Sequence, residues 1–170
     1  MISVIIPAYN HENFIEKTLQ PLLKNTDIFK QIIIIDDCSL DRTANIADKL
    51  AAIHRQITII RKRENRGVVD SLNMGLSHVT ERFVYLCASD DIPDPAGIRL
   101  LSDRLHENMD LNFILGNGTY IKGNQSSIIY NSYHDKFLNA EINWIRKNLF
   151  INYPKPLLLQ ASLFRASMLR

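Results

Sequence analysis

Short runs of apolar residues alternate with helical patterns along the first 115 residues, and this alternation constrains the fold most. The runs are rich in β-branched and aromatic residues and are too short for helices. They show no polar alternation, so we expect both faces of each strand to be covered. The five predicted strands are Ser3–Ile6, Gln31–Ile35, Ile57–Ile60, Phe83–Cys87 and Phe113–Leu115. This order predicts an α/β domain with a mostly parallel sheet and helices on both faces of the sheet.

Four segments between the strands carry apolar residues at helical spacing. The first covers residues 14–23, with Asn10 as a candidate N-cap. The second follows a capping Asp41, and the fourth begins at Asp94-Pro95, an N-cap followed by proline. The apolar faces of the last three helices are formed by Ala44, Ala47, Leu50 and Ala51, by Val68, Val69, Leu72, Leu76 and Val79, and by Leu100, Leu101 and Leu105. Residues 116–135 are predicted to form loops around a short strand at Thr119–Lys122.

Length and composition exclude several classes of protein. The 170 residues fit one domain with its own core. A net charge of +2 argues against a nucleic-acid partner. Cys38 and Cys87 form neither a disulfide framework nor a zinc motif, which suits the cytoplasm. No stretch is apolar enough to span a bilayer, and the first ten residues lack a secretory signal. We therefore expect a cytoplasmic protein.

Positive charge is concentrated after Glu141, the last acidic residue. The five cations there are Arg146, Lys147, Lys155, Arg165 and Arg170. One interpretation is chance over a short window. The other is a surface that faces anionic lipid or a phosphate-linked acceptor, which predicts peripheral contact with a membrane.

The residues that follow the first two strands are candidates for ligand contact, because ligands bind beyond the carboxyl ends of parallel strands. Pro7 is expected to stop the first strand, and Ala8 and Tyr9 come next. Tyr9 is either a packed core aromatic or a stacking surface for a base. After the second strand, we favour a ligand contact for Asp37, since a carboxylate accepts hydrogen bonds from a base N–H or a ribose hydroxyl.

Neighbouring acids follow the fourth strand. Asp90 and Asp91 repel each other unless a cation or a donor relieves them. Carboxylate oxygens suit Mg²⁺ or Mn²⁺, which bind through one or two carboxylates together with substrate phosphates. The alternative is a capping turn before the next helix, a role that Asp94 fits and that Asp90 and Asp91 do not.

Arg66 and Gly67 stand at the start of the third predicted helix. Gly67 allows close approach of the backbone, and a helix start beside an arginine favours an anion or a nucleotide.

Other α/β enzyme families are disfavoured by missing motifs, because the chain has no GxGxxG after the first strand, no GxxxxGK[ST] and no G-x-S-x-G. The five histidines show no metal-ligand spacing and are interpreted as surface residues.

With these residues in view, the chain resembles a family 2 glycosyltransferase with the GT-A fold. The motifs SVIIPAYN, IIIIDDCSLDRT, ENRGVVDSLNMGL and FVYLCASDDIPDP occur in the family's order, and the resemblance covers nearly all 170 residues. The resemblance implies a single glycosyltransferase domain over residues 1–170. Its nucleotide-sugar-binding half would be residues 1–115, and residues 116–170 would be part of the acceptor-side half.

The resemblance also implies roles for individual residues. Pro7, Ala8 and Tyr9 would hold the base and ribose, and Asp37 would read the base, usually uracil. Arg66 and Gly67 would lie near the base and phosphates. Asp90 would lie near the ribose and sugar, and Asp91 would bind the Mn²⁺ or Mg²⁺ on the diphosphate. The segment Gln160–Arg165 resembles a later segment of the family near the acceptor.

In this family an acidic motif after that later segment supplies the catalytic base. No Asp or Glu follows Glu141, so we expect the base beyond Arg170.

The reaction that the resemblance implies is transfer of a sugar from a nucleotide-diphosphate donor, with inversion at the anomeric carbon. The acceptor would be a saccharide or a lipid-linked saccharide in surface-polysaccharide synthesis. The alternatives are a degenerate glycosyltransferase that binds nucleotide without turnover and a nucleotidyltransferase, although PAYN replaces the latter's Gly-rich loop.

Apolar residues near the C-terminal end suggest self-association or membrane contact, because we expect them to lie exposed. They are Tyr153, Leu157–Leu159, Leu163, Phe164, Met168 and Leu169.

Overall fold

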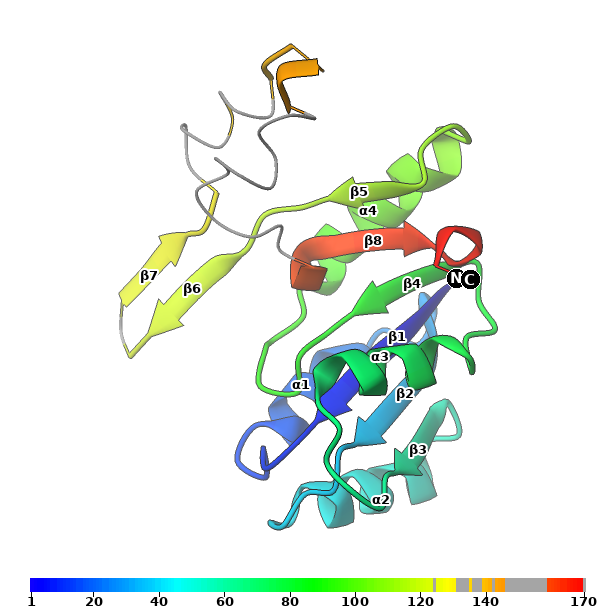
Figure 1. Cartoon of the computed structure of the whole chain (residues 1–170), viewed down its shortest axis with the longest axis vertical. Coiled ribbons are helices and arrows are strands. Elements are labelled where there is room, and N and C mark those ends of the chain that lie inside the picture. Colours follow the sequence, from blue (N-terminus) through cyan, green and yellow to red (C-terminus); the bar gives the residue numbers. More distant parts are fainter. Residues whose placement is uncertain (124, 131–134, 136–138, 142, 146–158, 170) are drawn as a thin grey trace.

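The computed structural model describes all residues except 124, 131–134, 136–138, 142, 146–158 and 170. Its main sheet contains six strands: β1 (Ile2–Ala8), β2 (Phe29–Asp36), β3 (Ile57–Arg61), β4 (Phe83–Leu86), β5 (Phe113–Leu115) and β8 (Ser162–Arg165). Their order across the sheet is β3-β2-β1-β4-β8-β5 (Figure 1). β1 to β4 are parallel, and β8 runs antiparallel to both of its neighbours. All five predicted strands are present.

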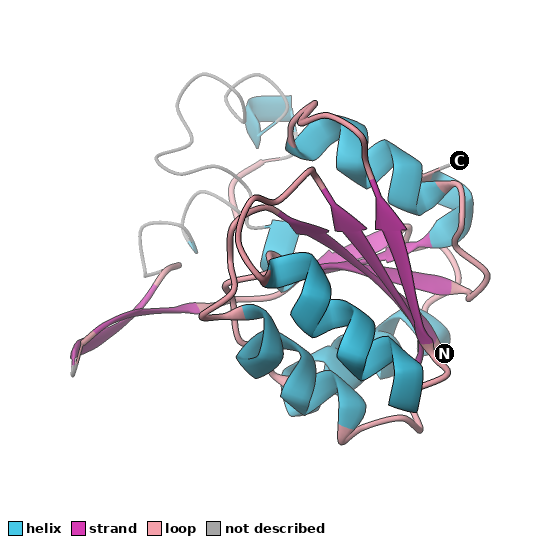
Figure 2. Ribbon diagram, turned by 90° about the horizontal axis from the view of Figure 1, so that it is seen from below, coloured by secondary structure: helices cyan, strands magenta, loops and turns pink. Residues whose placement is uncertain are grey.

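Four helices cover the two faces of this sheet: α1 (Ile15–Leu23), α2 (Thr43–Ile53), α3 (Val68–Leu76) and α4 (Pro95–Glu107). Figure 1 shows α3 in front of the sheet and the other three helices behind it, and Figure 2 shows the layers from below. Alternate strand residues face opposite ways: Val4 packs in one apolar cluster with residues of α1, α2 and α4, whereas Ile5 packs in the other with residues of α3. The predicted layered α/β architecture is confirmed.

Three local expectations about the loops and helices are wrong. Pro7 does not stop β1, because the strand continues in register with β2 to Ala8. Asn10 does not cap α1; its side-chain oxygen accepts the N–H of Leu40 at 2.8 Å, and α1 begins at Ile15. Leu100 is exposed and does not belong to the apolar face of α4, whereas Leu105 is buried and Leu101 is partly buried as expected, together with Ile98. The Asp94 cap is confirmed, because its side chain accepts the N–H of Ala96.

Helix α3 lies unusually close to the sheet. Its buried residues are Ser71 and Gly75, and a Cβ on Gly75 would fall on the side chain of Ile5. The expected apolar face of this helix is therefore only partly used for packing. Val68 and Val69 are exposed instead, and this leaves them free to form the wall of a cleft.

Strand β8 is an element that the sequence did not predict. Leu163 and Phe164 were expected to lie exposed, but both are buried in β8 between β4 and β5. Leu159 and Met168 are exposed as expected, whereas Leu169 is partly buried against the α3-side cluster. Tyr153 and residues 157–158 lie outside the described residues. β8 carries residues of the predicted acceptor-side half into the main sheet, and the boundary at residue 115 stays a prediction.

Arg165, at the end of β8, is not a surface charge. It is 7% exposed, and its guanidinium donates to the carbonyls of Leu105, Asn108 and Leu111. These carbonyls belong to the end of α4 and the turn after it, where unpaired acceptors need donors. Of the five cations expected to face anionic lipid, Arg165 is thus a buried structural residue. Arg146, Lys147, Lys155 and Arg170 lie outside the described residues.

A two-stranded hairpin stands away from the main sheet (Figures 1 and 2). It pairs β6 (Thr119–Lys122) with β7 (Gln125–Ile128), and all eight residues are exposed. Strand β6 was predicted and β7 was not. Single turns of 3₁₀ helix, η1 (Leu159–Ala161) and η2 (Ala166–Met168), flank β8. Within the described parts of the chain, no helix combines the length and the hydropathy needed to cross a bilayer.

Candidate functional site

A cleft of about 480 Å³ opens at the carboxyl ends of the parallel strands. It is lined by Pro7–Tyr9 from the end of β1, Leu86–Ser89 from the end of β4, and Val68, Val69 and Leu72 from α3. Asp37, His11, Leu159 and Gln160 complete the lining. The cleft lies where the parallel-sheet rule places ligand sites.

Tyr9 stands at this cleft with an open ring. The residue is 41% exposed, so the core-aromatic alternative does not hold. The backbone of the loop after β1 is held by hydrogen bonds to the segment after β2. The N–H of Asn10 donates to Oγ of Ser39, and the N–H of His11 donates to Oγ1 of Thr43. The loop after β1 is thus tied to its neighbour while the Tyr9 ring remains available for stacking.

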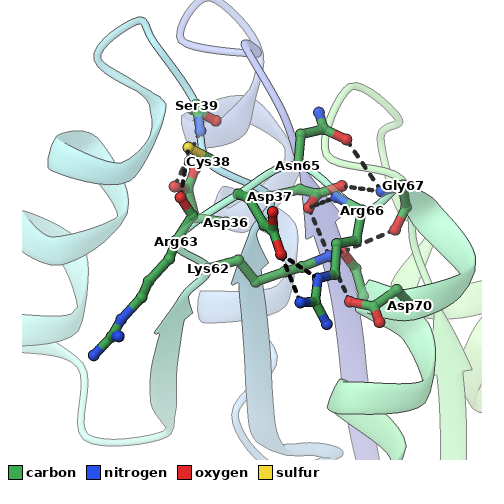
Figure 3. A network of polar contacts seen from close by, with 12 residues as sticks. Asp36, Asp37, Cys38, Ser39, Lys62, Arg63, Asn65, Arg66, Gly67 and Asp70 are labelled. Carbon is green, nitrogen blue, oxygen red and sulfur yellow. Dashed lines mark hydrogen bonds and ion pairs between the residues drawn. The ribbon is translucent and has the colours of Figure 1, made fainter.

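Asp37 lies just beyond β2 and is 4% exposed. Its Oδ1 accepts the N–H of Arg66 at 2.9 Å, and its Oδ2 accepts the N–H of Gly67 at 2.8 Å (Figure 3). Nζ of Lys62 lies 2.6 Å from Oδ1. The carboxylate therefore holds the turn that leads into α3, and it also lines the cleft.

Lys62 was not singled out by the sequence analysis, although its side chain is only 4% exposed. Its Nζ also lies 2.7 Å from Oδ2 of Asp70 and 3.2 Å from Oγ of Ser71. The parallel register pairs Asp36 with Arg61, so one further step brings Lys62 beside Asp37. That register was the available signal, because Lys62 stands between Arg61 and Arg63 and its residue type alone did not distinguish it.

The pKa values of this buried pair follow from these contacts. Burial alone raises the pKa of Asp37, but the hydrogen bonds from Lys62, Arg66 and Gly67 outweigh burial and hold the pKa below its ordinary value. Burial likewise lowers the pKa of Lys62, and the bonds to Asp37 and Asp70 outweigh this and raise it. Both groups are therefore charged at neutral pH.

Arg66 and Gly67 contribute their backbone rather than their side chains. The guanidinium of Arg66 pairs with Glu64 at the surface, with Nε 2.8 Å from Oε1, and it does not line the cleft. Gly67 has φ +83°, and a Cβ there would meet no atom of the chain within 4 Å. The left-handed backbone requires glycine at this position, and the close approach of a ligand to this backbone stays a prediction.

Asp90 and Asp91 stand beside the cleft, beyond β4. Ser89 is buried and lines the cleft, and its Oγ lies 2.6 Å from Nδ1 of His11. The same Nδ1 lies 3.9 Å from Oδ1 of Asp90. His11 was interpreted as a surface histidine, and the structure corrects this because the ring joins the cleft lining to the acid pair.

The acid pair fits a divalent cation. The pKa of Asp91 is raised, first by partial burial of its carboxyl group and second by the negative charge of Asp90. A positive charge on His11 would lower it. A cation would relieve that repulsion. The described residues contain no group of three or more His, Cys, Asp and Glu side chains arranged for a metal. The pair would therefore hold Mg²⁺ or Mn²⁺ together with phosphate oxygens of a ligand.

The segment that resembles the family's later motif reaches the site only at its start. Gln160 lines the cleft, and its carbonyl accepts the hydroxyl of Tyr85 at 2.7 Å. Ala161 is the last residue of η1, and Ser162–Arg165 form β8 in the sheet. Of the predicted site residues, the structure thus brings Pro7, Ala8, Tyr9 and Asp37 into the cleft, with the backbone of Arg66 and Gly67 behind Asp37.

Solved structures share this architecture. The chain superimposes on S. aureus TarS 1–349 in complex with UDP with a TM-score of 0.74 and 22% identity, covering 99% of this chain and 47% of that one. It also matches the mannosyltransferase PcManGT from Pyrobaculum calidifontis, in complex with GDP-Man and Mn²⁺, with a TM-score of 0.60 and 23% identity over 67% of this chain and 34% of that one. The fold is the GT-A fold of glycosyltransferases.

Comparison of sequences gives the family. An uncharacterized glycosyltransferase of Haemophilus influenzae is 30% identical over 122 residues, which cover 72% of this chain and 37% of that protein. The putative teichuronic acid biosynthesis glycosyltransferase TuaG of Bacillus subtilis is 34% identical over 91 residues, covering 54% of this chain and 36% of TuaG. The chain spans little more than a third of the length of these relatives. Because the family model of glycosyl transferase family 2 matches residues 3–166, the chain belongs to this family.

Proposed function

We propose that this chain binds the nucleotide-sugar donor of an inverting, metal-dependent glycosyltransferase. One observation carries the proposal: the carboxyl edge of the sheet holds an open aromatic ring, a buried carboxylate and an acid pair beside one cleft. These are Tyr9, Asp37 and Asp90–Asp91. They supply the three chemical groups that a base, a ribose and a metal-bound diphosphate require.

The base would lie on Tyr9 with its polar edge toward Asp37. Uracil suits this carboxylate because its imide N–H donates one hydrogen bond to an acceptor. Pro7 and Ala8 would form the floor beneath base and ribose. UDP is therefore the proposed nucleotide, and a dTDP donor presents the same edge.

The sugar diphosphate would lie toward Asp90 and Asp91. Asp90 would accept hydrogen bonds from ribose or sugar hydroxyls, and Asp91 would hold the Mn²⁺ or Mg²⁺. When bound, the cation would neutralise charge on the leaving diphosphate as a Lewis acid. His11 lines the same cleft, and its Nδ1 is engaged with Ser89.

The proposed acceptor is a saccharide or a lipid-linked saccharide. Two solved complexes of TarS contain UDP and UDP-GlcNAc, and the relatives TuaG and GgaA of B. subtilis carry names from teichuronic and teichoic acid biosynthesis. These relatives support a donor with UDP and a role in cell-surface polysaccharide assembly. The cytoplasmic location, the peripheral membrane contact and the homo-oligomer stay predictions.

A second candidate function is binding of the nucleotide without turnover. Among the described residues, Asp37 is the one acid that lines the cleft, and Lys62 and two backbone amides already occupy it. It is therefore a poor base for an acceptor hydroxyl. The catalytic base stays a prediction for residues beyond Arg170.

Thermal unfolding with UDP, Mn²⁺, both or neither tests the donor site. UDP at about 100 times its dissociation constant stabilises a protein by roughly 2.7 kcal/mol, which shifts the melting temperature measurably. We expect a shift that requires UDP and Mn²⁺ together and that is lost in Asp91→Ala. Asp103→Ala, at an exposed position on α4, is the matched control and should keep the shift.

The two candidate functions are separated by a second measurement. Release of UDP from UDP-sugar, with a saccharide acceptor present, should accompany binding in a catalytic chain. Binding without UDP release favours the non-catalytic function. No thermal shift with UDP, GDP or dTDP would rule out the proposed donor site.

A further inference from the structure

We infer that Lys62 is a positioning residue for nucleobase recognition: it holds the carboxylate of Asp37 so that one defined acceptor position faces the cleft. The inference rests on the proposed function, since it presumes that a nucleotide occupies the cleft. Lys62 itself does not line the cleft and would not touch the ligand.

Burial is the first observation behind this inference. A lysine ammonium is rarely buried unless it is paired, because removing the charge from water is costly. The Lys62 side chain is 4% exposed and lies between two carboxylates, with Asp37 at 2.6 Å and Asp70 at 2.7 Å. One positive charge therefore faces two negative ones, and the cluster keeps a net negative charge next to the cleft.

The second observation is the position of the contacts in the fold. Lys62 follows β3, Asp37 follows β2, and Asp70 lies in the first turn of α3 (Figure 3). The ammonium thus joins three elements that meet behind the cleft. Loss of this one group would free the Asp37 carboxylate at the point where the base is proposed to bind.

The third observation is the number of acceptor positions left on Asp37. A carboxylate offers about four lone-pair positions, two on each oxygen. Lys62 and the Arg66 N–H take those of Oδ1, and the Gly67 N–H takes one of Oδ2. Oδ2 keeps one position for a ligand. A single charged acceptor accepts a hydrogen bond from the imide N–H of uracil. It repels the unprotonated ring nitrogen of cytosine, which is itself an acceptor.

Without Lys62, Oδ1 regains an acceptor position and the buried carboxylate loses its cation. The carboxylate can then accept a hydrogen bond from a ligand at either oxygen, for example from the amino group of cytosine. Preference for uracil over cytosine should therefore fall. A lysine that only stabilised the fold would change stability and leave this preference unchanged.

The test measures binding of UDP and CDP by calorimetry, with Mn²⁺ present, to the whole 170-residue chain. The variants are Lys62→Met, Asp37→Asn and the double variant Lys62→Met/Asp37→Asn. Arg61→Met is the matched control, because Arg61 is the preceding residue and pairs with Asp48 at the surface. The double variant removes both buried charges together, so Asp37 is not left as an unpaired buried carboxylate, and the loss of the Asp70 contact is common to this variant and Lys62→Met.

We expect the wild type and Arg61→Met to bind UDP at least about tenfold more tightly than CDP, a preference worth about 1.4 kcal/mol. Lys62→Met should reduce this ratio to about threefold or less. Asp37→Asn and the double variant should bind UDP equally within about twofold, because Lys62 acts through Asp37. This last comparison holds even where Lys62→Met alone does not fold.

Two results would overturn the inference and leave the proposed function intact. One is an unchanged UDP-to-CDP ratio in folded Lys62→Met. The other is UDP binding to the double variant that is about tenfold weaker than to Asp37→Asn, which would show an independent role for Lys62. A wild-type chain that binds neither nucleotide would overturn the proposed function and this inference together.

Discussion

Nζ of Lys62 lies 2.6 Å from Oδ1 of Asp37, and both side chains are almost completely buried. The two residues come from the ends of neighbouring parallel strands, 25 positions apart in the chain. Through Asp37 the pair also fixes the N–H groups of Arg66 and Gly67, which begin the turn into α3. This ion pair connects the stability of the sheet edge to the shape of the cleft.

The ion pair predicts how stability changes with pH. Because the pKa of Asp37 lies below its ordinary value of 3.8 in the folded chain, its contribution is complete above pH 3.8 and is lost as the pH falls through the folded pKa. Urea unfolding from about pH 5 down to about pH 2.5 should show a steeper loss of unfolding free energy in the wild type than in Asp37→Asn. Parallel pH profiles for the two proteins would contradict this prediction.

Arg165 should contribute far more to stability than a surface arginine. Arg165→Met leaves three carbonyl groups at the end of α4 without their charged donor, and each such loss costs about 1–3 kcal/mol. Arg99→Met removes an exposed ion pair with Asp27, which is worth at most about 1 kcal/mol. We expect urea unfolding to show a drop of at least about 2 kcal/mol for Arg165→Met only. Equal effects of the two variants would speak against the buried role of Arg165.

Gly75→Ala should destabilise the chain even though alanine is the better helix former. The added Cβ would fall on the side chains of Ile5 and Ile35, and overpacking of this kind costs about 1–3 kcal/mol. The gain in helix propensity is at most about 1 kcal/mol. Asn73→Ala, at an exposed position of the same helix, gains propensity without a clash. Thermal unfolding should therefore shift downward for Gly75→Ala and not for Asn73→Ala, and a stabilised Gly75→Ala would refute the close packing of α3.

Tyr9→Ala should weaken nucleotide binding with little effect on folding. Stacking of a base on an aromatic ring is worth about 1–3 kcal/mol, so the affinity for UDP should fall by about fivefold or more. Tyr120→Ala removes an exposed tyrosine from the β6–β7 hairpin and serves as the control. Calorimetric titration with UDP measures both. Unchanged UDP binding by Tyr9→Ala would leave Asp37 as the base contact and remove stacking from the proposal.

Much of the fold was predictable from local patterns. Gln31–Ile35 lies within the observed β2, Phe113–Leu115 matches β5, and the Asp94-Pro95 start of α4 is confirmed by a hydrogen bond. β8 was not predictable in this way. Its four residues, Ser162–Arg165, carry little local signal, and they become a strand by pairing with β4, almost 80 positions earlier. Asn10 was assigned to the wrong partner for a similar reason, since its hydrogen bond to Leu40 spans 30 positions.

The candidate site, like the fold, was predictable from the sequence only in part. The sequence by itself determined which side chains stand near the strand ends, because apolar runs that end a few residues before Tyr9, Asp37 and Asp90 are visible in one dimension. Only the tertiary structure decided what those side chains meet. It placed Lys62 against Asp37, turned Arg66 toward Glu64 and brought His11 to Ser89. The physical reason is that an apolar strand packs against a whole layer, so its pattern is readable without knowing any single contact. A buried charge depends instead on a specific partner, and only the fold brings that partner to it.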